Sequence, residues 1–168
     1  SLNNLKDKDL RKKLSQNLPD KLIVVAEAIR RNINIKNIYK LTKIDPWFLE
    51  QISDLVKEEK KLKKNGVPKT LKEFSYIKSI GFSDSKIAEL TKTSTKTIQN
   101  KRRKLKIFPV FKKIDTCAAE FKSETPYMYS TYQKLADNLS ACESNPTKKE
   151  KIIILGGGPN RIGQGIEF

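Results

Sequence analysis

Apolar residues recur three or four positions apart between about residue 20 and residue 105, with polar residues between them. This spacing places the apolar side chains on one face of a helix. It predicts a first helix in DKLIVVAEAIRRN, directly after Pro19, and a shorter second helix in NIKNIYKLTKID. The positions predicted to be buried in these two helices are Leu22, Val25, Ala26, Ile29, Ile35, Ile38, Tyr39 and Leu41.

The longest predicted helix covers PWFLEQISDLVKEEKKLKK and starts at Pro46. Asp45 is a favourable N-cap, and Pro46 suits the first helical position because a backbone N–H there would have no helical partner. Gly66 ends the helix because glycine tolerates the left-handed conformation of a helix C-terminus. The predicted buried stripe is Phe48, Ile52, Leu55 and Leu62, while Trp47 and Phe48 fit a core and an interface equally well.

Three more helices are predicted from their start and stop signals. Thr70 and Glu73 form a capping box at the start of the first, and Gly81 ends it. Ser83 starts a short helix, and Ser94 starts another that runs through KRRKL. Helical segments joined by short turns indicate a compact, mainly α domain. The predicted buried residues of these three helices are Phe74, Ile77, Ile80, Ile87, Ala88, Leu90 and Ile98.

The pattern changes after residue 106. The stretch KIFPVFKKIDTCAAEFKSETPYMYSTY contains prolines and no helical period, so we expect an extended tail that lies across a surface. QKLADNLSACE, from residue 133, has the pattern of a short helix, and the polar linker SNPTKKEK follows it. The apolar run IIIL then leads into a glycine-rich turn, as a buried parallel strand of an α/β domain does. We expect a domain boundary near residues 145 to 150.

Composition narrows the classes of function. The 168 residues include 35 Lys and Arg against 19 Asp and Glu, and the net charge of +16 favours nucleic acid, acidic membrane or acidic protein as partner, although a general enrichment in lysine explains the same excess. With two cysteines and no histidine, neither a disulfide framework, a zinc site nor histidine catalysis is expected. No apolar run approaches the roughly 20 residues that span a bilayer, and SLNNLKDKDLRKKL lacks a signal-peptide core. We expect a cytoplasmic protein with no membrane contact.

Residues 83 to 105 have the pattern of a DNA-binding helix-turn-helix. From Leu90 to Ile114 there are nine Lys or Arg residues and no acid, a charge that would neutralise phosphates. The alternative is two helices of an ordinary α core with a basic outer face, and it is favoured by Lys92 at the turn position that glycine usually occupies. The residues that carry the pattern are Ala88 and Ile98 at the helix contact, Ser94 at the cap, and Lys96, Gln99, Asn100 and Arg103 toward the groove.

The C-terminal GGGPNRIGQG has the glycine content of a loop that holds an anion at a helix N-terminus. The loop lacks the Lys-Ser/Thr ending of a P-loop and the spacing of a GxGxxG fingerprint, and Pro159 removes one backbone donor. A tight strand-to-helix connection explains the same glycines. The candidate residues are Gly156, Gly157, Gly158 and Gly163.

Three stretches together resemble the large subunit of carbamoyl-phosphate synthase: LTKIDPWFLEQI (41–52), KKIDTCAAEFKSETPYMYSTY (112–132) and KIIILGGGPNRIGQGIEF (151–168). The resemblance implies that residues 1 to 19 end the first synthetase half of that subunit and that residues 20 to 145 form its helical oligomerisation domain. Residues 146 to 150 would be a linker, and residues 151 to 168 would start the pre-ATP-grasp domain of the second half. The implied fold is mainly α, a compact multi-helix domain with an extended tail and a C-terminal strand and loop that begin an α/β domain.

In this family, two ATP-grasp halves make carbamoyl phosphate from bicarbonate, ammonia and two ATP, for pyrimidine and arginine biosynthesis. The resemblance implies that the full-length ligase uses ATP with Mg²⁺ or Mn²⁺ and receives ammonia from a small glutamine amidotransferase subunit. It implies no catalytic, cofactor-binding or metal residue within this segment, which would be inactive alone. The segment would link the two halves and mediate subunit association, and nucleic-acid binding becomes the disfavoured alternative.

The resemblance also implies a role for the last residues. Carbamate is unstable in water, and the family passes it through an internal tunnel near the start of the second half. By their position in GQGIEF, Gly165 and Glu167 resemble tunnel-lining residues. A carboxylate that the helix dipole favours at a helix N-terminus is the other explanation of Glu167.

Overall fold

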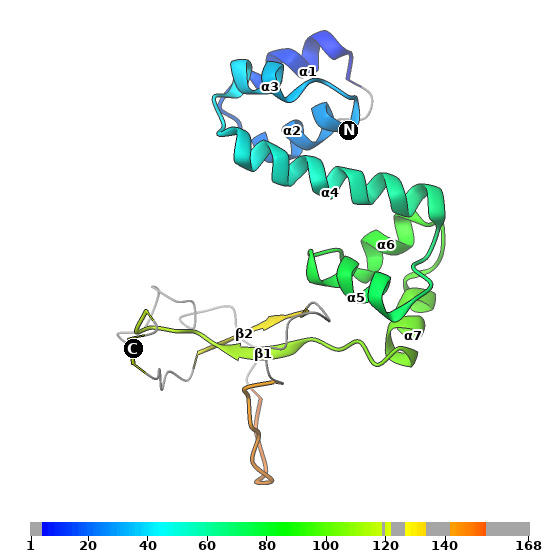
Figure 1. Ribbon diagram of the computed structural model, residues 1–168, viewed down its shortest axis with the longest axis vertical. Coiled ribbons are helices and arrows are strands. Elements are labelled where there is room, and N and C mark those ends of the chain that lie inside the picture. The colour runs from blue at the N-terminus through cyan, green and yellow to red at the C-terminus, as the bar shows by residue number, and fades with distance from the viewer. Residues whose placement is uncertain (1–4, 119, 122–126, 134–141, 154–168) are drawn as a thin grey trace.

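The computed structural model describes residues 5–118, 120–121, 127–133 and 142–153. These residues form seven α-helices and one antiparallel sheet of two strands (Figure 1), which confirms the mainly α fold. None of the described helices is long and apolar enough to cross a membrane. The helices are α1 (Asp7–Leu14), α2 (Lys21–Arg30), α3 (Ile35–Thr42), α4 (Pro46–Asn65), α5 (Leu71–Ser79), α6 (Asp84–Leu90) and α7 (Thr95–Lys104), and the strands are β1 (Val110–Lys113) and β2 (Met128–Thr131).

The helix starts follow the predicted capping signals. At the start of α4, Oδ1 of Asp45 accepts a hydrogen bond from the backbone N–H of Trp47 at 2.8 Å. Thr70 and Glu73 form the predicted capping box of α5. Each cap satisfies a backbone N–H that has no partner within the helix, which fixes where the helix begins. Side-chain oxygens cap three further helices, from Asn34, Ser83 and Ser94.

Two hydrophobic cores lie along α4, one toward each end. Leu49 and Val56 pack into the first core with α1, α2 and α3, and Leu62 packs into the second with α5, α6 and α7. Figure 1 shows α4 running as one helix from the first group to the second. The first core comprises Leu10, Leu14, Val24, Val25, Ala28, Ile29, Ile38, Leu49 and Val56. The second comprises Leu62, Phe74, Ile77, Phe82, Ile87, Ala88, Leu90, Ile98 and Ile107.

The first helix, α1, was not predicted from the sequence. Its segment DKDLRKKL holds only two apolar residues among six charged ones, too few for a recognisable helical face. Leu10 and Leu14 are nevertheless fully buried in the first core, beside α2. The packed helices therefore begin ahead of residue 20, where the sequence places the start of the helical domain.

Four residues predicted to be buried are exposed, which corrects the assigned faces of three helices. They are Leu22, Tyr39, Phe48 and Leu55. In α4 the face toward the first core is Leu49, Ile52 and Val56, so Leu49 and Val56 take the places predicted for Phe48 and Leu55. The remaining predicted positions are buried or pack partly buried against a core: Val25, Ala26, Ile29, Ile35, Ile38, Leu41, Ile52, Leu62, Phe74, Ile77, Ile80, Ile87, Ala88, Leu90 and Ile98.

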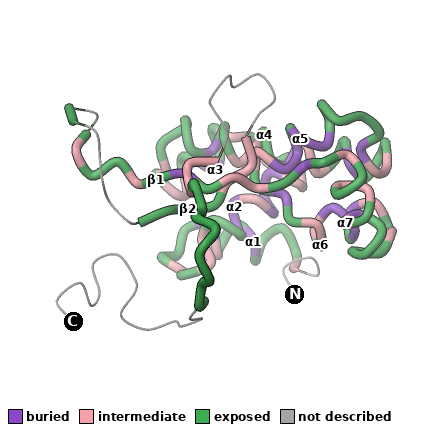
Figure 2. The backbone as a smooth tube through the Cα atoms, turned by 90° about the horizontal axis from the view of Figure 1, so that it is seen from below, coloured by how far each residue is buried: buried purple, intermediate pink, exposed green. Residues whose placement is uncertain are grey.

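The predicted extended tail contains a strand pair that the sequence did not indicate. β1 and β2 run antiparallel, with Val110 opposite Thr131 and Lys113 opposite Met128. Just after β2, the backbone carbonyl of Gln133 accepts a hydrogen bond from the Ser75 hydroxyl of α5 at 3.2 Å. Figure 2 shows that the buried segments gather in the helices while both strands are largely exposed.

Most of the predicted C-terminal elements lie outside the described residues. This holds for residues 134–141 of the predicted short helix and for residues 154–168, which include the whole glycine loop. Ile152 and Ile153, predicted to begin a buried strand, are described; they lie in no strand and are exposed.

A largely shielded ion cluster joins α5, α6 and α7. Asp84 begins α6, and its Oδ1 lies 2.9 Å from Nζ of Lys78 on α5, while its Oδ2 lies 3.0 Å from Nε of Arg102 on α7. Lys78 also donates to the carbonyl of Phe82 at 2.7 Å, and Arg102 donates to that of Ile107 at 2.9 Å. Burial raises the pKa of the Asp84 carboxyl, but hydrogen bonds and charge from Lys78 and Arg102 outweigh it and hold this pKa below its usual value.

We predict that Asp84→Ala destabilises the chain by about 3 kcal/mol, because it leaves the buried Lys78 and the largely shielded Arg102 without their counter-charge. Urea unfolding followed by circular dichroism measures the change. Asp54→Ala is the matched control, since the Asp54–Lys57 pair is 64% exposed on both sides, and we expect it to cost less than about 1 kcal/mol. Equal losses for the two variants would contradict the role of the cluster.

The same comparison has an expected pH dependence. Because the pKa of Asp84 is lower in the folded chain, its stabilising effect is complete above the unfolded value of about 3.9 and is lost as the pH falls through the folded value. The gap in unfolding free energy between the parent chain and Asp84→Ala should therefore narrow below about pH 4. A constant gap from neutral to acid pH would contradict this assignment.

Candidate functional site

An apolar surface lies on the N-terminal half of α4. Trp47, Phe48 and Leu55, here called the α4 strip, are 59%, 55% and 41% exposed. Phe48 and Leu55 are two helical turns apart and lie on one face, and the Trp47 ring meets the Phe48 ring edge-on with 4.9 Å between centroids. Large exposed apolar side chains that lie together on a surface mark contact sites for other proteins.

The rotation of α4 is what exposes this strip. Leu49 and Val56 are held in the first core, which turns Phe48 and Leu55 away from it. Asp45 caps the helix two residues before Trp47, so the aromatic pair occupies its first turn. The strip is therefore set by the core and by the cap.

An ion-pair network fixes α2 against the middle of α4. Arg30 makes two hydrogen bonds to the Glu59 carboxylate, from Nε at 2.6 Å and from the guanidinium Nη2 at 2.9 Å. Burial raises the pKa of the Glu59 carboxyl, but the hydrogen bond and charge of Arg30 outweigh it and lower this pKa overall. Arg31, which directly follows α2, pairs with Glu27 at 2.9 Å and with Asp7 of α1 at 3.0 Å. These ion pairs link α1, the C-terminal end of α2 and α4 to one another.

The predicted helix-turn-helix pair corresponds to α6 and α7, which pack against each other. Ala88 and Ile98 are buried at the contact of α6 and α7. Lys92 has a φ of 53°, the left-handed conformation that glycine usually supplies at this turn. The N–H of Thr93 donates to the carbonyl of Ala88 at 3.0 Å and closes the end of α6.

The predicted groove-facing side chains of α7 do not all share one environment. Lys96, Asn100 and Arg103 are exposed, and Gln99 is half-buried. Arg102, the best-shielded cation of α7, is already held by Asp84 and a backbone carbonyl. The buried contacts account for the helix pair as part of the second core, and DNA binding stays the alternative prediction.

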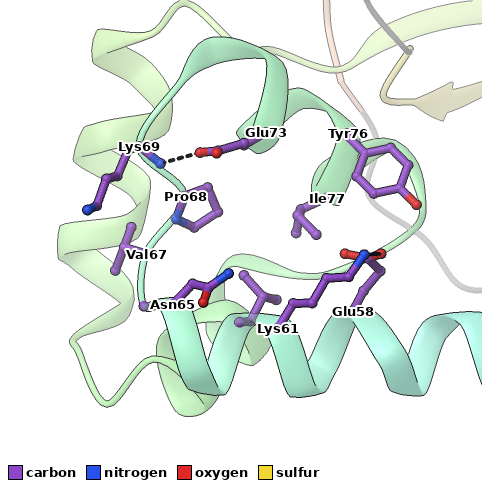
Figure 3. A pocket seen from close by; sticks show the side chains of 11 residues that line it. Glu58, Lys61, Asn65, Val67, Pro68, Lys69, Glu73, Tyr76 and Ile77 are labelled. Atoms are coloured by element: carbon purple, nitrogen blue, oxygen red, sulfur yellow. Dashed lines mark hydrogen bonds and ion pairs between the residues drawn. The ribbon is translucent and has the colours of Figure 1, made fainter.

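A hollow of about 710 Å³ lies between α4 and α5, beneath the loop that joins them. Figure 3 shows Lys61, Glu58 and Tyr76 at one end of it and Lys69 with Glu73 at the other. Lys61 pairs with Glu58 at 2.7 Å, and the Glu73 carboxylate accepts the backbone N–H of Lys69 at 2.9 Å. Backbone hydrogen bonds, that from Lys69 first, lower the pKa of Glu73. These polar groups stabilise the turn itself, so we do not assign the hollow to a ligand.

The site residues predicted at the C-terminus fall outside the described part of the chain. They are Gly156, Gly157, Gly158, Gly163, Gly165 and Glu167. Among the residues that are described, no three His, Cys, Asp or Glu side chains are grouped so that they could hold a metal ion.

Comparisons with known proteins give one consistent result. Residues 1–106 match the family model for the oligomerisation domain of the carbamoyl-phosphate synthetase large chain. The carbamoyl phosphate synthase large chain of Pseudomonas aeruginosa is 47% identical over 163 residues, which cover 96% of this chain and 15% of that protein. The large chain of Mesorhizobium japonicum is 45% identical over 159 residues, 95% of this chain and 14% of that protein. The chain thus spans about one seventh of the length of these relatives.

The orientation of α4 predicts unequal effects for two leucines. We expect Leu49→Ala to lower the free energy of unfolding by about 3 kcal/mol, because it opens a cavity in the first core. Leu55→Ala should cost less than about 1 kcal/mol, since that side chain is 41% exposed. Thermal and urea unfolding of both variants measure the difference. A larger loss of stability in Leu55→Ala than in Leu49→Ala would support the buried stripe predicted from the sequence, in which Leu55 faces the core.

Proposed function

The chain belongs to the carbamoyl-phosphate synthetase large-chain family, and we propose that it joins subunits of such an enzyme through the α4 strip. The observation that carries this proposal is the exposure of Trp47, Phe48 and Leu55 on a helix that is otherwise anchored in two cores. The name of the matching family domain, which refers to oligomerisation, supports it.

The chemistry of the strip suits an apolar contact between copies. Fully burying a side chain of this size contributes about 1.5–3 kcal/mol, and aromatic residues are enriched among interface anchors. Two copies related by a two-fold axis would each use the same surface, so one exposed strip per chain is sufficient. The net charge of +16 opposes association by mutual repulsion, and salt screens that repulsion.

For the whole protein we propose the activity that the family resemblance implies. It would be an ATP-dependent ligase that makes carbamoyl phosphate from bicarbonate, glutamine-derived ammonia and two ATP in the cytoplasm. ATP, its Mg²⁺ or Mn²⁺, and the small glutamine amidotransferase subunit would bind outside this segment. Because the chain spans about 15% of such relatives, most of the length of each relative lies outside the matched part.

Within that protein the segment would link the two ATP-grasp halves. The proposed divisions are residues 1–19, 20–145, 146–150 and 151–168, with one change. The helical unit starts earlier and includes α1, because Leu10 and Leu14 pack in its core. Gly165 and Glu167 would line the carbamate tunnel, next to the loop of Gly156–Gly158 and Gly163. This assignment depends on the sequence resemblance alone.

We predict that Leu55→Glu weakens self-association at least about tenfold, because a carboxylate would have to be desolvated in the contact. Leu71→Glu is the matched control: Leu71 is 42% exposed, against 41% for Leu55, but it lies on α5. Sedimentation equilibrium of the chain at moderate salt gives both constants. Equal weakening by the two variants, or a chain that is monomeric at every concentration, would contradict the proposal.

A second prediction concerns the tunnel and requires the complete enzyme. Glu167→Ala should leave bicarbonate-dependent ATP hydrolysis unchanged while less carbamoyl phosphate forms per ATP, because carbamate escapes before it reaches the second half. Glu150→Ala, in the proposed linker, is the control and should preserve coupling. Coupling that is unchanged in Glu167→Ala would leave this residue with only a helix-terminal role.

A further inference from the structure

A second hollow, separate from the α4 strip, lies where the end of α2 and the length of α3 meet α4. Its volume is about 890 Å³. Apolar side chains form much of its lining and come from all three elements. They are Ile29, Ile33, Ile35, Tyr39, Pro46 and Val56. Hollows of this size with a mostly apolar lining are typical binding sites, and this one can accept apolar side chains of a ligand.

Lysines follow both sides of this groove. Lys36 and Lys40 stand on α3, and Lys57 and Lys60 stand on α4. The groove contains a single carboxylate, Glu50, so its charged side chains sum to four cations against one anion. On each helix the two lysines are three or four residues apart. This spacing places them on one side of that helix, with about 5–6 Å between their Cβ atoms.

The two rows differ in how they are engaged. Lys60 donates to the side-chain oxygen of Asn32 at 2.8 Å, and Lys57 pairs with Asp54 at 2.7 Å in a contact that is 64% exposed on both sides. Within the described part of the chain, the ammonium groups of Lys36 and Lys40 make no ion pair or hydrogen bond; Lys36 uses only its backbone N–H, which donates to the Asn34 side chain. The α3 row therefore offers its charge to a partner.

We propose that this groove binds an acidic amphipathic segment of a partner polypeptide. Apolar side chains of the segment would lie on the floor around Ile33 and Tyr39, and its carboxylates would reach the lysine rows of α3 and α4. Such a segment presents both kinds of group along its length, as an amphipathic helix does when it enters a groove. The proposal goes beyond self-association, which uses a different face of α4.

The distribution of charge selects this class of ligand. A small anion needs cations that converge on one point, whereas these lysines are spread in two rows along the helices. A nucleic acid would set phosphates and polar base edges against an apolar floor. A second copy of the chain carries its own net charge of +16 and would bring more positive charge to the groove.

The test uses the chain and a fluorescein-labelled synthetic peptide of Leu, Ala and Glu, with leucines at helical spacing on one face. Fluorescence anisotropy at moderate salt measures its affinity. Lys36→Glu combined with Lys40→Glu should weaken binding at least about tenfold, because close charge pairs across an interface are reversed. Tyr39→Ser, which changes the floor without changing the charge, should weaken it several-fold.

The matched control is Lys8→Glu combined with Lys12→Glu on α1. These lysines are exposed, lie four residues apart on a helix that, like α3, has eight residues, and do not line the groove. The control should change the affinity by less than about threefold, the effect of net charge alone. If the reversal in α3 unfolds the chain, Lys36→Gln with Lys40→Gln removes the charge at similar length and should give an intermediate loss.

Several outcomes would overturn the proposal. Equal losses in the α3 and α1 variants would mean that the peptide senses only net charge. Equal binding of a peptide with its leucines replaced by serine would remove the role of the apolar floor. Competition by duplex DNA that Tyr39→Ser does not affect would identify a nucleic-acid surface. Sedimentation changes in the α3 variants would assign the groove to a second copy, whereas failure of the self-association proposal would appear in Leu55→Glu.

Discussion

The continuity of α4 is the constraint on which the other features depend. It is one helix of 20 residues, about 30 Å long, and it contributes to both hydrophobic cores. A core that fixes one end of a rigid helix also fixes the rotation of the other end. The packing of Leu49 and Val56 beside α1, α2 and α3 therefore decides which residues of the whole helix face solvent.

Three faces of α4 take three different roles as a result. One face packs into the first core, a second carries the exposed Phe48 and Leu55, and a third lines the lysine-edged groove through residues such as Ser53 and Lys57. The Arg30–Glu59 pair holds α2 against the helix between these faces. A change in the core that rotated α4 by one residue, about 100°, would move both surfaces at once.

The sequence predicted local features better than tertiary ones. The caps at Asp45, Thr70 and Ser94 were recognised because a cap involves only neighbouring residues. The buried face of α4 was assigned wrongly because its first half is apolar at 47, 48, 49, 52, 55 and 56, which supports two overlapping stripes. Only the neighbouring helices choose between those stripes. The β1–β2 pair and the Asp84 cluster likewise join residues that are distant in the sequence.

The candidate surfaces could not be predicted from the sequence for the same reason. They are expected to respond to salt in opposite ways. The α4 strip has no charged member, so the positive charge of each copy only hinders contact there, and screening by salt favours it. The groove depends on Lys36 and Lys40 for attraction, so screening by salt weakens it. Both surfaces include residues of α4, whose rotation the core determines. Their separation by charge lets α4 serve an apolar contact between like chains and, together with the lysines of α3, an electrostatic contact with an unlike partner.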